Sequence, residues 1–115
     1  MSATQPTLRD LKIKTGTVKR LFKDENSYRK ESESQQKHID KLISEGADEH
    51  DISKQKEVLQ ESLNMIPDCQ NRLKEAQKEL QKLLENKDAS WEGTEELKQA
   101  EDILEQININ KGNTN

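Results

Sequence analysis

The chain has 115 residues, of which 37% are charged and 29% are hydrophobic, and its net charge at pH 7 is −4. So low a hydrophobic content excludes a thick globular core, and it leaves either a disordered chain or one domain of long amphipathic helices. The acidic balance argues against nucleic acid as the main partner. No apolar run is long enough for a targeting or membrane-spanning segment, and the single cysteine cannot form an internal disulfide. We therefore expect a soluble cytoplasmic protein without a membrane partner.

The first predicted helix spans about residues 8–44. Thr7 is a suitable N-cap residue with Asp10 three positions later, as in a variant capping box, and Gly46 supplies the position that ends the helix. Gly16 lies inside this helix and costs about 1 kcal/mol relative to alanine. We expect it to allow the close approach of another group to that helix face.

The second predicted helix spans about residues 49–85, with Asp48 as its cap. Steps of seven residues meet an apolar side chain each time, which is typical of a helix packed along a partner helix. These positions are Ile52, Leu59, Ile66, Leu73 and Leu80. Pro67 lies inside this otherwise continuous stripe, and a proline in a helix interior costs about 3 kcal/mol. It indicates a kink that wraps the helix around its neighbours, or a binding surface shaped by that kink.

The third predicted helix spans about residues 91–108, with Ser90 as its cap and residues 109–115 as a frayed tail. Its apolar stripe consists of Leu97, Ala100, Leu104 and Ile107. When the chain is folded back at both breaks, apolar positions face each other, with Leu21, Leu73 and Leu104 near one layer. We therefore predict an all-α fold: one domain over residues 1–115, an antiparallel, spectrin-like three-helix bundle with two long helices and a shorter third.

Charge is distributed unevenly along this bundle. Residues 8–23 contain six basic side chains against one acid, and residues 88–108 contain seven acids against one lysine. The basic residues are Arg9, Lys12, Lys14, Lys19, Arg20 and Lys23. The favoured interpretation is weak pairing with the third helix along a solvated edge. The alternative is an anionic partner, such as an acidic protein tail.

No residue pattern predicts catalysis or a metal site. His38 and His50 lie on different segments, and no cysteine stands at ligand spacing from them. Cys69 falls on the apolar stripe of the second helix, where a packing role is expected. No glycine-rich phosphate loop is present in the sequence. We expect a protein that is not an enzyme and needs no cofactor.

Two stretches resemble a known family. Residues 13–21, IKTGTVKRL, resemble the first-helix signature of tubulin-folding cofactor A. Residues 58–69, VLQESLNMIPDC, followed by Arg72 and Leu73, are similar to the second-helix signature, with its proline inside the helix. The resemblance covers roughly residues 8–107. The third helix matches only in pattern, and Trp91 to Gly93 departs from it.

The resemblance implies a three-helix chaperone that uses no nucleotide. Such a chaperone accepts β-tubulin after the cytosolic chaperonin, holds it, and yields it to other tubulin-folding cofactors on the route to the αβ heterodimer. It would be cytoplasmic and associated with the cytoskeleton. The alternative function is that of a structural coiled-coil or helical-bundle interaction module. The shortness of the third helix argues against a repeat of the spectrin type.

A mismatch along the bundle predicts where a client protein binds. The third helix ends near Ile107, and beyond that point residues 29–38 of the first helix contain no apolar side chain, whereas the second helix stays apolar. Surplus apolar surface of this kind usually marks an interaction site. The candidate residues are Tyr28, Val58, Leu59, Leu63, Met65, Ile66 and Pro67. Alternatively, this surface closes a homodimer or is covered by Ile109 and the tail. The second candidate site is a basic face formed by Lys12, Lys19 and Lys23.

Overall fold

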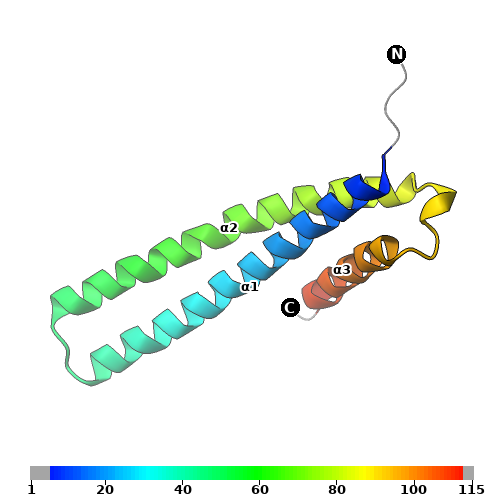
Figure 1. The fold of residues 1–115 in the computed structure, drawn as a ribbon. Helices are drawn as coiled ribbons and strands as arrows, with labels where there is room; N and C mark the ends of the chain where they lie inside the picture. Colours follow the sequence, from blue (N-terminus) through cyan, green and yellow to red (C-terminus); the bar gives the residue numbers. More distant parts are fainter. Residues whose placement is uncertain (1–5, 113–115) are drawn as a thin grey trace, which may run out of the picture. The chain divides into compact units, whose positions relative to one another are not determined.

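A computed structural model describes residues 6–112 of the chain, and within this range all regular structure is helical (Figure 1). Helix α1 spans Leu8–Ser44 and α2 spans Glu49–Glu85, and a short 3-10 helix over Ala89–Trp91 precedes α3, Glu95–Gly112. The predicted fold class, an antiparallel three-helix bundle with a shorter third helix, is confirmed. Among the residues described, no helix combines the length and the apolar character that crossing a bilayer requires.

The internal contacts group the chain into two compact units. The three-helix unit comprises Met1–Phe22 and Arg72–Asn115, and the hairpin unit comprises Lys23–Asn71. Each long helix contributes residues to both units, whereas α3 belongs to the three-helix unit alone.

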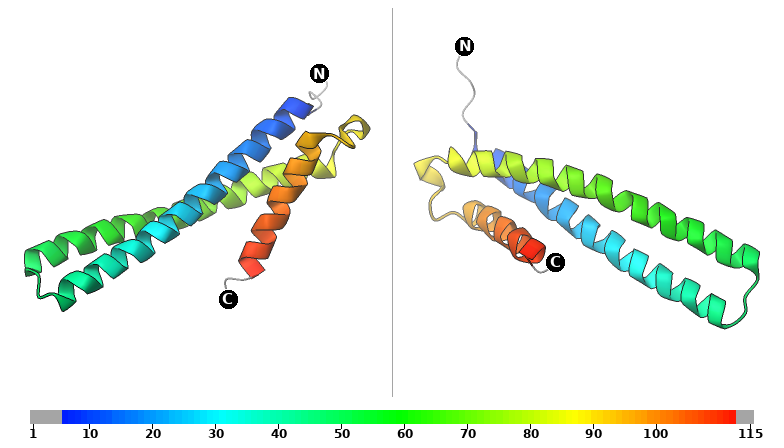
Figure 2. Two further views of the ribbon diagram at one scale, coloured as in Figure 1. Left: turned by 60° about the horizontal axis from the view of Figure 1, so that its bottom comes forward. Right: turned by 180° about the vertical axis from the view of Figure 1, so that it is seen from behind.

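The three-helix unit contains most of the apolar core. The start of α1, the end of α2 and α3 lie side by side in all views of Figures 1 and 2. Buried apolar side chains come from all three helices and from the connection between α2 and α3. They are Leu11, Val18, Leu21, Leu73, Ala76, Leu80, Trp91, Leu97, Ala100, Ile103 and Ile107. Leu104, which was predicted to share a layer with Leu21 and Leu73, is only half-buried, and its neighbour Ile103 is buried instead.

The hairpin unit has a much sparser core. Its two antiparallel helices bury only Ile39 and Cys69 among their described hydrophobic residues. Polar groups occupy much of the interface. The side-chain amide of Gln35 donates to the backbone carbonyl of Gln55 at 2.9 Å and to the side-chain carbonyl of the same residue at 2.8 Å. Interhelical hydrogen bonds of this kind fix the register of the pair and add little apolar burial.

Local signals explain where α1 begins and ends. The Thr7 hydroxyl accepts a hydrogen bond from the Asp10 backbone N–H, and the Asp10 carboxylate accepts one from the Thr7 backbone N–H, which together form the capping box. At the other end, Ala47 N–H donates to the Leu42 carbonyl and Gly46 N–H to the Ile43 carbonyl. Gly46 has φ +75°, which favours glycine at this position of a Schellman motif.

The predicted start of the third helix at residue 91 is wrong. The Ser90 hydroxyl, the predicted cap, donates to the carboxylate of Asp88 instead. The true cap is Thr94, whose hydroxyl accepts from the Leu97 backbone N–H at 3.2 Å and donates to the Trp91 carbonyl at 2.6 Å. Helix α3 also continues past the predicted end at residue 108, to Gly112. Residues 113–115 of the predicted tail lie outside the described residues.

Replacing Thr94 tests this cap. Thr94→Ala removes the acceptor for Leu97 N–H and should lower the free energy of unfolding by about 1 kcal/mol. Thr94→Ser keeps the hydroxyl and should remain close to the wild type. Urea denaturation followed by circular dichroism measures both variants. Equal stability of the alanine and serine variants would contradict the assignment of Thr94 as the cap.

Candidate functional site

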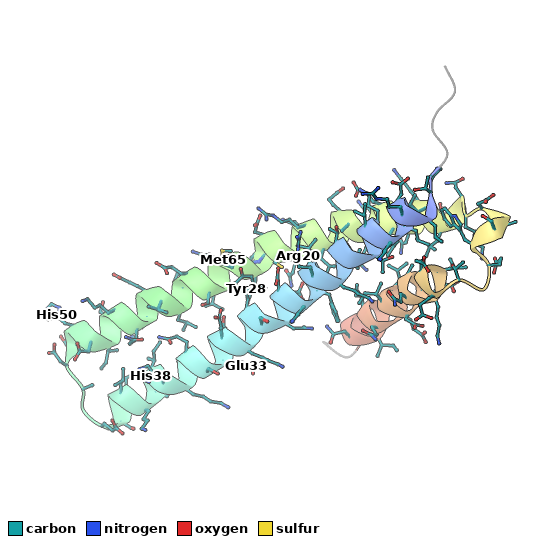
Figure 3. The ribbon with its side chains drawn as sticks, in the orientation of Figure 1. Arg20, Tyr28, Glu33, His38, His50 and Met65 are labelled. Atoms are coloured by element: carbon teal, nitrogen blue, oxygen red, sulfur yellow. The ribbon has the colours of Figure 1, made fainter. Side chains whose placement is uncertain are left out.

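A groove of about 510 Å³ opens between the two helices of the hairpin unit. Tyr28 of α1 forms one wall, and α2 supplies the other. Figure 3 shows Tyr28 and Met65 on the facing parts of these helices. The α2 residues that line the groove are Val58, Glu61, Ser62, Asn64 and Met65. Val58 and Met65 are 45% and 44% exposed, so apolar surface is open to solvent on this wall.

The six predicted site residues that belong to α2 do not share one face of that helix, and the exposed ones lie along two different edges. At about 100° per residue, Val58 and Met65 lie within about 20° of each other around the helix axis. Leu63 is about 140° away from Val58 and, although 41% exposed, does not line the groove. Pro67 is exposed and lies still further round, while Leu59 and Ile66 are half-buried between the two edges. Of the seven predicted residues, the groove therefore brings together Tyr28, Val58 and Met65.

A second, more polar hollow of about 740 Å³ adjoins the groove. It shares Val58 and Ser62 with the groove, and the remaining lining comes from α1. These α1 residues are Ser27, Lys30, Glu31, Ser34, Gln35 and His38. Sequence reasoning missed Ser62 as a lining residue, although a small side chain in the apolar stripe of α2 was the available signal. The two hollows together give Val58 a central position.

Pro67 does not interrupt α2, which is helical without a break from Glu49 to Glu85. Proline has no N–H, so the carbonyl of Leu63, four residues earlier, lacks its usual donor within the helix. At about 100° per residue, Leu63 and Pro67 lie within about 40° of each other, on the edge of α2 away from the groove. The structure thus places the proline at the edge opposite Val58 and Met65.

The predicted basic face is divided between the units, because Lys12 and Lys19 belong to the three-helix unit and Lys23 to the hairpin unit. The Lys19 ammonium donates to the side-chain carbonyl of Gln99 on α3 at 3.4 Å, so its contact with the third helix is to an amide and not to an acid. Lys14 instead forms an ion pair with Glu79 of α2 at 2.7 Å. The hydrogen bond from Lys14 lowers the pKa of the Glu79 carboxyl.

The groove offers apolar surface on which part of another polypeptide can pack. His38 lies on α1 and His50 in the first turn of α2, and within the described range no three His, Cys, Asp or Glu side chains gather as a metal site (Figure 3). Cys69 is buried. What the hairpin unit offers is an open groove with Tyr28 on the α1 wall and two exposed apolar side chains, Val58 and Met65, among the polar residues of the α2 wall. Such grooves suit an apolar side chain or an amphipathic segment of another protein.

Comparison with known proteins gives a consistent result. The family model described as tubulin binding cofactor A matches residues 6–104. A Gallus gallus protein named tubulin-specific chaperone A is 49% identical over 104 residues, which cover 90% of this chain and 95% of the relative. The structure of human tubulin chaperone cofactor A is similar with a TM-score of 0.74 and 46% identity, covering 88% of this chain and 97% of that one. The crystal structure of tubulin folding cofactor A from Arabidopsis thaliana has a TM-score of 0.79 at 36% identity, covering 88% and 94%.

Proposed function

Because this chain belongs to the tubulin binding cofactor A family, we propose that it is a tubulin-folding chaperone that binds and holds β-tubulin. It accepts the subunit after the cytosolic chaperonin and passes it to other tubulin-folding cofactors on the way to the αβ heterodimer. The observation that carries this proposal is the family match over nearly the whole helical part of the chain. The names of the relatives support the tubulin client.

The groove of the hairpin unit is the proposed client surface. Val58 and Met65 present apolar surface that a client segment can bury, and Tyr28 closes the groove from α1. Methionine has an unbranched, flexible side chain and adapts to different partner shapes. Holding a client in this way needs burial of apolar surface and no chemical step, so the proposed activity is non-enzymatic and independent of nucleotide. The protein acts in the cytoplasm, and its association with the cytoskeleton follows from its client.

Affinity capture from cytosol tests the client. The immobilised chain should retain β-tubulin without α-tubulin, and removal of nucleotides with apyrase should not change the amount retained. Blots for both tubulins measure the outcome. Equal capture of α- and β-tubulin would contradict selectivity for β-tubulin, and absence of both would favour a structural helical module. Dependence on ATP or GTP added to the chaperone alone would contradict the nucleotide-independent mechanism.

A further inference from the structure

One face of α1 in the three-helix unit has a feature that the chain's own packing does not explain. Gly16 lies at the middle of this face, inside a continuous helix, and it is exposed. A Cβ atom added at Gly16 would meet no atom within 4 Å. Alanine would therefore fit without conflict and would favour the helix. Neither a turn nor a close internal contact requires glycine at this position.

The surroundings of Gly16 are cationic. The side chains three or four residues before and after it share its helix face, opposite the buried Leu11, Thr15 and Val18. Three of them are basic, Lys12, Lys19 and Arg20, and Arg9, two helical turns before Gly16, lies on the same face. None of Arg9, Lys12 and Arg20 is in an ion pair with another described residue. The nearby acid Asp10 is turned about 100° away from Arg9 around the helix, and its carboxylate caps Thr7.

The same face also carries apolar surface. Ile13 is 55% exposed, and it lines a shallow hollow of about 670 Å³ together with Gly16. The rest of the lining consists of Leu8, Arg9, Lys12 and Glu96. An occupant of this hollow would meet a bare stretch of helix backbone at Gly16, an isoleucine beside it, and cations at both ends.

We propose that this face, defined as Arg9, Lys12, Ile13, Gly16, Lys19 and Arg20, is a second docking surface, and that its occupant is an acidic polypeptide segment carrying an apolar side chain. The cations select carboxylates, Ile13 contacts the apolar side chain, and Gly16 lets the segment approach the helix backbone. This surface lies in the three-helix unit, whereas the groove lies in the hairpin unit, so the proposal stands independently of the proposed client site.

The charge and composition of the face favour this occupant over two others. Nucleic acid is disfavoured because the face has no aromatic side chain on which bases could stack, and because Glu96 lines the same hollow. A second copy of the chain, docked through the same face, would bring the two sets of cations together.

Binding of a fluorescent peptide tests the proposal. The probe is a short glutamate-rich peptide with one central leucine, and fluorescence anisotropy measures its Kd at low salt. Gly16→Gln fills the space above the backbone, and Lys12→Glu reverses one charge; each should raise the Kd by at least about tenfold. Lys54→Glu is the control, because it changes the net charge by the same amount as Lys12→Glu but at an exposed site of the hairpin unit. It should change the Kd by less than about twofold.

The Gly16→Gln variant also has a stability readout. Because glutamine favours the helix more than glycine does, and because its Cβ would meet no atom within 4 Å, the Tm should rise by about 2–6 °C while binding weakens. A lowered Tm would show that glycine is needed for the fold and would overturn the proposal. The proposal would also be overturned if Gly16→Gln bound the peptide with wild-type affinity, or if the wild type did not bind the peptide at all. Two control ligands could overturn it as well: a peptide with glutamine in place of glutamate, or a single-stranded oligonucleotide, that bound as tightly as the acidic peptide.

Discussion

The double variant Val58→Glu with Met65→Glu is expected to capture β-tubulin at least about tenfold more weakly than the wild type, a loss of roughly 1.4 kcal/mol or more. Both side chains are nearly half exposed on the same wall of the groove, so the carboxylates would occupy the surface on which the client packs. Burying those carboxylates against an apolar client segment is costly. A concentration series of immobilised chaperone, with β-tubulin measured by quantitative blotting, gives the affinity.

The variant should remain folded. Substitutions at exposed positions usually change stability by no more than about 0.5 kcal/mol each, so the two together should shift the Tm by no more than about 8 °C. The matched control is Leu63→Glu with Ile43→Glu, which introduces the same two charges at exposed apolar residues that do not line the groove. The control should retain normal capture. Loss of capture in the control alone would move the client site to the edge of α2 that carries Leu63 and Pro67.

The variant Leu73→Asp should unfold the three-helix unit. Leu73 is 3% exposed, and an aspartate there would be a buried charge without a partner. We expect a loss of about 4 kcal/mol or more, which is a large part of the roughly 5–15 kcal/mol by which native domains are stable. Loss of the helical circular dichroism signal, or a Tm too low to measure, would report this outcome.

Lys74→Asp is the control for this substitution. Lys74 is the exposed neighbour of Leu73 on the same helix, and its replacement should change the free energy of unfolding by about 0.5 kcal/mol at most. A cooperative transition of Leu73→Asp close to that of Lys74→Asp would contradict the position of Leu73 in the core.

The long helices could be predicted from the sequence because strong local signals define them. Thr7 with Asp10, and Gly46 with its positive φ, determine where α1 begins and ends through hydrogen bonds within a few residues. The seven-residue repeat of apolar side chains identifies α2 as a helix because such a repeat places them all on one face that can be buried. Both kinds of information are local or periodic, and tertiary packing reinforces them.

The connection to α3 could not be predicted in the same way. Ser90 and Thr94 are both good caps, and the choice depends on Trp91, which is buried in the core and uses its carbonyl to accept from the Thr94 hydroxyl. Gly93, with φ +80°, then allows the chain to turn into α3. Once α3 begins at Glu95, packing selects Ile103 over its neighbour Leu104, although both fit a helical stripe.

The candidate site was predicted in outline, as surplus apolar surface on the second helix. The sequence pattern did not separate its two edges, because Leu63 and Met65 are only two residues apart and flank the buried stripe on opposite sides. Only the facing position of Tyr28 shows which edge forms a groove. Whether β-tubulin occupies that groove stays a prediction.

The unequal distribution of apolar core between the two units has a consequence for the motions of the native protein. Regions that bury little apolar surface open through local fluctuations at a lower free energy than global unfolding. The hairpin unit, held by Ile39, Cys69 and the hydrogen bonds between Gln35 and Gln55, is such a region. We therefore expect its amide hydrogens to exchange with solvent during openings that leave the helices around the buried Leu11, Leu80 and Ile107 intact. The groove therefore lies in the part of the chain whose helices separate most readily, and it can widen for a client segment without loss of the three-helix core.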